Sequence, residues 1–127
     1  MADHLLDTDV LIWFLRGRKE TRAVFQEIEA GGIPLCSALS VLEIMFGVRE
    51  KEEKVTRYLL RSLRVVPVGE KEAEKAASLM RDYRKGGITL DLVDAVIAAT
   101  CLLHDLVLVT YNRSHYPMPP LKLFKMP

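Results

Sequence analysis

Several acidic residues of the sequence stand inside apolar segments, where a soluble protein normally places the side chains of its core. They are Asp7 and Asp9 in HLLDTDVLI, Glu43 in SALSVLEIMFG, and Asp91 and Asp94 in TLDLVDAVIAA. If these carboxylates converge in a partly dry site, their mutual repulsion would raise some of their pKa values. A divalent cation removes this conflict, and because the three histidines form no ligand motif, the carboxylate donors predict Mg²⁺ or Mn²⁺. Such an ion polarises a phosphoryl oxygen and activates a bound water, so the expected chemistry is phosphodiester hydrolysis.

Each of these acids also has a structural interpretation. Aspartate is a common helix N-cap and stabilises the first helical turn, so Asp7, Asp9 and Asp91 could be caps, and for Asp9 and Asp91 both interpretations stay open. Glu43 follows Ser40 by three residues, which is the spacing of a capping box. It is nevertheless expected on the apolar face of its helix, and Asp94 lies on the same helix surface as Asp91, three residues earlier. We therefore favour a functional role for Glu43 and Asp94.

Short apolar runs alternate with helical patterns along the whole chain. Strands are expected over residues 4–6, 33–36, 65–68 and 106–110 and in the final LKLF, and helices over residues 8–15, 19–30, 37–47, 51–63, 70–84 and 91–104. This alternation predicts a short, mainly parallel sheet covered by helices on both faces, which is a three-layer α/β/α sandwich. Asp7 then stands at the carboxyl end of the first strand, the edge at which such sheets bind ligands.

The composition predicts one domain over residues 1–127, half of which are hydrophobic. No apolar run reaches the roughly 18 residues of a membrane span, and the start MADH does not read as a secretory signal, so we expect a cytoplasmic protein. Cys36 and Cys101 lie in apolar runs and are expected to be buried thiols. A net charge of +1 excludes a global basic field of the kind that binds nucleic acid indiscriminately.

Four passages together resemble one known family. They are LLDTDVLI, SALSVLEIMFG, DAVIAATCLLHDLVLVT and YNRSHY, and they span most of the chain. With these four passages in this order, the chain resembles the PIN-domain ribonucleases, and specifically the VapC-type toxins of VapBC toxin–antitoxin pairs. The resemblance implies an α/β/α sandwich that forms a homodimer and cleaves RNA with Mg²⁺ or Mn²⁺, by attack of a metal-activated water.

The resemblance also assigns roles to single residues. It makes Asp7, Glu43 and Asp94 the metal-binding acidic core, and it places the hydroxyls of Thr8 and Thr110 beside the site.

The chain departs from the family pattern at three positions. The family often has asparagine or serine in place of Asp9, an acid or asparagine at Asn112, and phenylalanine at Tyr116. Asn112 can orient a metal-bound water but brings no charge, and Asp91 could supply the missing carboxylate.

Two kinds of partner follow from the resemblance. Candidates to hold the RNA backbone are Arg49, Arg57, Arg61 and Arg113. A VapB-like antitoxin would lie in a hydrophobic groove whose candidate residues are Leu11, Trp13, Phe14, Leu15, Phe46, Tyr58 and Leu59. Of these, Leu11, Leu15 and Phe46 are expected to be ordinary core, whereas Trp13 and Tyr58 better suit an interface because they are large aromatics with a polar group.

Two alternative functions stay open. LLDTDVL is close to the signature of haloacid-dehalogenase-type phosphatases, in which Asp7 would be the nucleophile, although in those enzymes the later acids follow a strand, whereas here they precede LVLVT. The chain could also be a non-catalytic PIN-like module that binds RNA or protein.

Overall fold

The structure, a computed structural model, describes residues 2–127 and contains a five-stranded parallel sheet in the order β3-β2-β1-β4-β5. The strands are β1 (His4–Leu6), β2 (Leu35–Ser37), β3 (Arg64–Val66), β4 (Val107–Val109) and β5 (Lys122–Leu123). Leu5 at the centre of β1 pairs with Leu35 on one side and with Leu108 on the other. All five strands therefore end at the same edge of the sheet.

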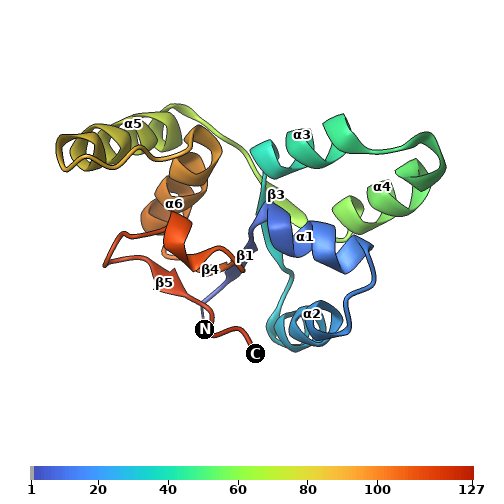
Figure 1. Cartoon of the computed structure of the whole chain (residues 1–127). Helices are drawn as coiled ribbons and strands as arrows, with labels where there is room; N and C mark the ends of the chain where they lie inside the picture. The colour runs from blue at the N-terminus through green and yellow to red at the C-terminus, as the bar shows by residue number, and fades with distance from the viewer. Residues whose placement is uncertain (1) are drawn as a thin grey trace.

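Helices cover both faces of this sheet. They are α1 (Thr8–Leu15), α2 (Lys19–Gly31), α3 (Ala38–Gly47), α4 (Glu53–Arg61), α5 (Glu70–Lys85) and α6 (Leu92–His104), with short 3₁₀ helices η1 (Glu50–Glu52) and η2 (Arg113–His115). Figure 1 shows α5 and α6 on one side and α1 to α4 on the other. Of the residues described, no helix is long and apolar enough to cross a membrane.

The two cores follow from the alternation of side chains along the strands. Leu5 and Leu108 pack with α5 and α6, whereas the next residues, Leu6 and Val109, pack with α1 and α2. The predicted α/β/α sandwich is confirmed.

Several element boundaries differ by one or two residues from the sequence prediction. The second strand begins at Leu35, two residues late, because Pro34 has no N–H for the sheet, and the strand extends to Ser37, whose Oγ caps α3 by accepting from the backbone N–H of Leu39 at 3.1 Å. The predicted helix 51–63 is shorter, and η1 occupies its first residues. Because the cap is Ser37, the capping-box interpretation of Glu43 is wrong.

Both cysteines are buried, as predicted. Burial raises the pKa of the Cys36 thiol to about 11 and the pKa of the Cys101 thiol to about 12. Neither thiol is reactive at neutral pH.

Candidate metal centre

Asp7 is the buried carboxylate at the carboxyl end of β1, and it is only 5% exposed. Its Oδ1 accepts a hydrogen bond from the backbone N–H of Thr8 at 2.8 Å, so Asp7 also caps α1. Its Oδ2 accepts from the hydroxyls of Thr110 and Tyr116, each at 2.8 Å. These donors come from three different parts of the chain and fix the carboxylate in one orientation.

Asp94 in the first turn of α6 lies beside Asp7. The Tyr116 hydroxyl, which contacts Asp7, is also 3.1 Å from Asp94 Oδ1, and His115 Nδ1 is 3.2 Å from Asp94 Oδ2. Partial burial and the neighbouring charge of Asp7 raise the pKa of Asp94. The structure thus brings together two of the predicted acids, which are 87 residues apart in the sequence.

Asp9 belongs to the same acidic group and is not a simple helix cap. Its Oδ2 accepts from the backbone N–H of Tyr111 at 3.1 Å, and its buried Oδ1 has no hydrogen-bond partner in the described part of the chain. Burial, and then the charge of Asp7, raise the pKa of Asp9 to about 6. A buried carboxylate oxygen without a donor is costly, and a cation would satisfy it.

Asp91 acts as a helix cap, which is the structural interpretation of this residue. Its Oδ2 accepts from the backbone N–H groups of Val93 and Asp94, at 3.1 and 3.3 Å, so Asp91 is the N-cap of α6. A metal-binding role for Asp91 stays a prediction.

Glu43 is exposed, and the expectation that it lies on an apolar, core-facing surface is wrong. The buried side of α3 is formed by Ser40 and Ile44, which are one turn apart, so Glu43 projects beside them toward solvent. It is nevertheless tied to the site, because its Oε1 lies 2.7 Å from the Thr8 hydroxyl, which in turn is 2.8 Å from Ser40 Oγ.

The remaining predicted residues lie around Asp7. Thr110 is buried, and its hydroxyl donates to Asp7 while accepting from the backbone N–H of Asn112 at 3.0 Å. The Asn112 side chain itself is exposed. Thr8 and Thr110 therefore contact the acids as expected, whereas water orientation by Asn112 stays a prediction.

Tyr116 is a site residue that sequence reasoning missed, as is His115, which contacts Asp94. The burial of Tyr116 and the two adjacent carboxylates raise the pKa of its phenol far above the usual range, so the hydroxyl keeps its proton and acts as a donor. The available signal was a tyrosine at a position where the resembling family has phenylalanine.

The donor chemistry suits a hard divalent cation. Of the residues described, His115 is the only basic one in ion-pair range of Asp7, Asp9 or Asp94, so no lysine or arginine neutralises the group. Within residues 2–127, no three His, Cys, Asp or Glu side chains are close enough to hold a metal by themselves, so the predicted three-carboxylate ligand cluster is not formed. Mg²⁺ commonly binds through one or two carboxylates and keeps several waters, which fits this arrangement.

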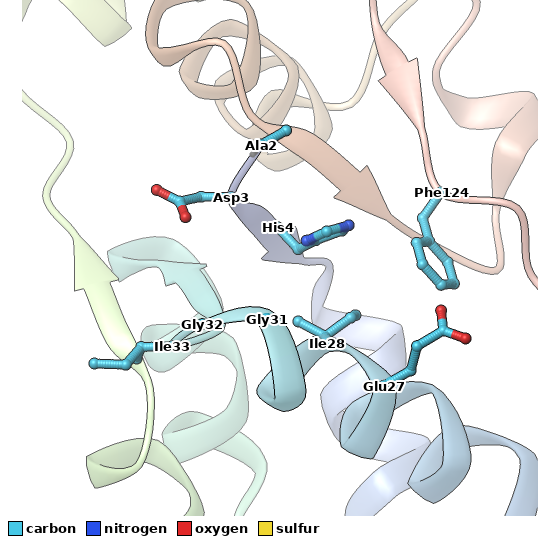
Figure 2. A pocket seen from close by; sticks show the side chains of 9 residues that line it. All are labelled: Ala2, Asp3, His4, Glu27, Ile28, Gly31, Gly32, Ile33 and Phe124. Carbon is cyan, nitrogen blue, oxygen red and sulfur yellow. The ribbon is translucent and has the colours of Figure 1, made fainter.

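Two hollows lie on the surface near the sheet. One of about 220 Å³ is lined by Asp91, Asp94 and His115, among others, and gives Asp91 and Asp94 an open side. The other, of about 150 Å³, is shown in Figure 2, where His4, Glu27 and Phe124 line it. It lies at the start of β1, at the end of the strand opposite Asp7, and so is not part of the acidic site.

The exposed apolar side chains differ from the predicted groove. Phe46 is 91% exposed, so its assignment to the core is wrong: it lies near the end of α3, whose buried residues are Ser40 and Ile44. Tyr58 is also exposed, whereas Leu11 and Leu59 are buried. Trp13 is 37% exposed, and the guanidinium of Arg18 lies over its ring, 4.8 Å from the ring centroid.

Comparison with known proteins gives a consistent result. The PIN domain model matches residues 4–118. Ribonuclease VapC10 of Mycobacterium tuberculosis is 39% identical over 114 residues, which cover 90% of this chain and 86% of the relative. A toxin–antitoxin complex from Klebsiella pneumoniae matches with a TM-score of 0.77 and 28% identity, covering 97% of each chain.

A further structure shows the same fold at lower sequence identity. VapBC2 from Rickettsia felis, bound to a DNA fragment from its promoter, matches with a TM-score of 0.86 and 17% identity over 98% of both chains. With the matching model and the 39% identical relative, the chain belongs to the PIN-domain family.

Proposed function

We propose that this PIN-domain protein is an endoribonuclease that depends on Mg²⁺ or Mn²⁺ and acts as the toxin of a toxin–antitoxin pair. The observation that carries the proposal is the pair of carboxylates, Asp7 and Asp94, held together at the carboxyl edge of a parallel sheet, with no lysine or arginine of residues 2–127 in ion-pair range of them. The 39% identity to a ribonuclease supports RNA as the substrate.

The side chains of the site have different proposed roles. Asp7 and Asp94 would hold the cation directly, and Asp9 and Glu43 would reach it through bound water. Bound there, the cation supplies phosphoryl polarisation and a more acidic water. Thr110 and the backbone N–H of Thr8 keep the Asp7 carboxylate oriented throughout, because both are donors that need not move. His115 lies on the open side of Asp94, with its Nδ1 at 3.2 Å from Asp94 Oδ2.

Arginines near the site are proposed to hold the RNA backbone. Arg113 begins η2 beside the acids, whereas Arg57 is engaged with Glu53 at 3.4 Å on exposed α4. Arg49 and Arg61 stay candidates from the sequence. Arg18 joins them, because it lies between the rings of Trp13 and Tyr111, at 4.8 Å from each, and the Tyr111 backbone contacts Asp9.

The proposed antitoxin partner fits the exposed apolar surface on α3 and α4. This surface is formed by Leu42, Phe46, Val55 and Tyr58. Figure 1 shows the two helices side by side at the edge of the molecule. An amphipathic antitoxin helix would bury these side chains, which explains why they are apolar although exposed. Homodimerisation is proposed from the resemblance, and size-exclusion chromatography with light scattering tests it.

The alternatives make different predictions. A phosphatase with Asp7 as nucleophile needs a lysine near its acids, and in the described residues no lysine is in ion-pair range of them. The deciding experiment is cleavage of single-stranded RNA by the purified protein with Mn²⁺, with EDTA, and with Asp94→Asn. We expect metal-dependent products with 5′-phosphate ends. Mn²⁺ binding without any cleavage would support the non-catalytic module instead.

A further inference from the structure

The hydroxyl of Tyr116 occupies the position between the two central carboxylates. It is 2.8 Å from Asp7 Oδ2 and 3.1 Å from Asp94 Oδ1. A phenol has one proton to donate, so at any moment it serves one of the two oxygens or is shared between them. No other single group contacts both acids among the residues that the structure describes.

The hydrogen bonds of Asp7 show why its contact with Tyr116 matters for metal binding. Oδ1 already accepts from Thr8, and Oδ2 accepts from Thr110 as well as from Tyr116. The Tyr116 hydroxyl thus uses the Oδ2 lone pair on the side of Asp7 that faces Asp94. A cation shared by the two aspartates would need electron density from the same region.

Tyr116 cannot easily move aside. Its side chain is 3% exposed and packs in the core formed with α5 and α6, and its backbone N–H donates to the carbonyl of Arg113 at 3.0 Å. Swinging the ring out would expose this apolar surface and leave a cavity. The hydroxyl therefore stays near the acids whether or not a cation is bound.

We propose that Tyr116 is a positioning residue that holds Asp7 and Asp94 together in the metal-free protein and competes with the divalent cation for their oxygens. This inference rests on the proposed function, because it assumes that these acids bind the metal. It goes further by assigning to Tyr116 the control of metal affinity.

Two electrostatic effects of the Tyr116 hydroxyl both weaken the binding of a cation. The positive end of the O–H dipole points at the carboxylates, so it relieves part of their repulsion before metal binds and reduces what a cation can gain. The same dipole end repels a cation placed at these oxygens. Tyr116→Phe removes both effects while keeping the ring that fills the core. The variant should be less stable without metal and should bind metal more tightly.

The opposite changes in metal-free stability and in metal affinity distinguish this role from a merely structural one. A structural tyrosine, when replaced, would lower stability and weaken or leave unchanged the binding of metal. A tyrosine whose oxygen ligates the cation would also give weaker binding when it is replaced. Only competition predicts lower metal-free stability together with higher affinity.

The test is isothermal titration of the metal-free full-length protein with Mn²⁺. The matched control is Tyr83→Phe, which also removes one hydroxyl, at 3.2 Å from the carbonyl of Pro117 and without contact to the acids. We expect Tyr116→Phe to bind Mn²⁺ about tenfold more tightly, the equivalent of one charge-assisted hydrogen bond, and Tyr83→Phe to match the wild type. The rise of the melting temperature with Mn²⁺ gives a second, independent measure of affinity.

The outcomes distinguish the two proposals. Mn²⁺ binding by the wild type that is lost in Asp94→Asn supports the metal site. Given that result, equal or weaker binding by Tyr116→Phe overturns the role of Tyr116 alone. Absence of Mn²⁺ binding by the wild type overturns both.

Discussion

Asp9 and Tyr111 join the first helix to the segment after β4: Asp9 Oδ2 accepts from the Tyr111 backbone N–H at 3.1 Å, while Asp9 Oδ1 is buried without a hydrogen-bond partner in the described chain. One oxygen is thus fixed by the fold, and the other is left for a ligand. This half-satisfied carboxylate has measurable consequences for stability.

The carboxyl group of Asp9 should make the metal-free protein less stable as the pH rises from 4 to 7, relative to a protein without it. The pKa of Asp9 is raised from 3.8 to about 6 in the folded protein. Across this interval the folded state still holds a proton that the unfolded chain has lost, so raising the pH removes it and lowers the free energy of unfolding, by about 1 to 3 kcal/mol. The raised pKa of Asp94 acts in the same direction. Urea unfolding at pH 5 and pH 7 in EDTA measures the effect.

Asp9→Asn should reduce this pH dependence, because its amide oxygen can still accept from Tyr111 while the titrating charge is gone. The matched control is Asp82→Asn, an exposed aspartate on α5, which should leave the dependence unchanged. If the wild type and Asp9→Asn showed the same change of stability over this interval, the proposed environment of Asp9 would be contradicted.

Asp94→Asn and Asp91→Asn should distinguish the roles of the two acids at the start of α6. Asp94→Asn should lower RNA cleavage about a hundredfold or more, because it removes a charge from the cation's ligands. Without metal, its melting temperature should be unchanged or higher, since the repulsion with Asp7 is relieved. Asp91→Asn should keep the stability, because asparagine is an equally good N-cap, and its activity tests the predicted metal-binding role of Asp91. Loss of activity in Asp91→Asn would show that its carboxylate, and not only its cap, is needed.

The sequence predicted the sheet and the region of the site because both depend on local signals. Buried strands are apolar over consecutive residues, and Asp7 directly follows one of them, so its position at the sheet edge was predictable. The contact of Tyr116 with Asp7 and Asp94 depends on how the chain returns after β4, and no local pattern encodes that path. Phe46 was misassigned because its apolar character fits a core as well as an unpartnered surface.

Phe46→Ser should separate partner binding from folding. Because the side chain is 91% exposed, its removal should change the free energy of unfolding by less than about 0.5 kcal/mol. If the α3–α4 surface binds the antitoxin, the variant should lose co-purification with the product of a neighbouring antitoxin gene while keeping nuclease activity. Leu103→Ala, which changes a 43% exposed residue on α6, is the control and should still bind. Retained binding by Phe46→Ser would place the antitoxin elsewhere.

Thr8 should couple Glu43 to the metal site. The Thr8 hydroxyl lies 2.7 Å from Glu43 Oε1, and the Thr8 backbone N–H donates to Asp7, so one residue contacts both acids. Thr8→Val removes the hydroxyl contacts with Glu43 and Ser40 and leaves the exposed Glu43 side chain unanchored, so Mn²⁺ affinity should fall about tenfold, as expected for an outer contact that orients a ligand. Glu43→Gln should give a similar loss through removal of the charge, and Thr8→Ser should restore wild-type binding. Since Thr8→Val and Glu43→Gln act on one interaction, the double variant should bind no more weakly than either single variant, and additive losses in Mn²⁺ titrations would show that Glu43 acts independently of Thr8.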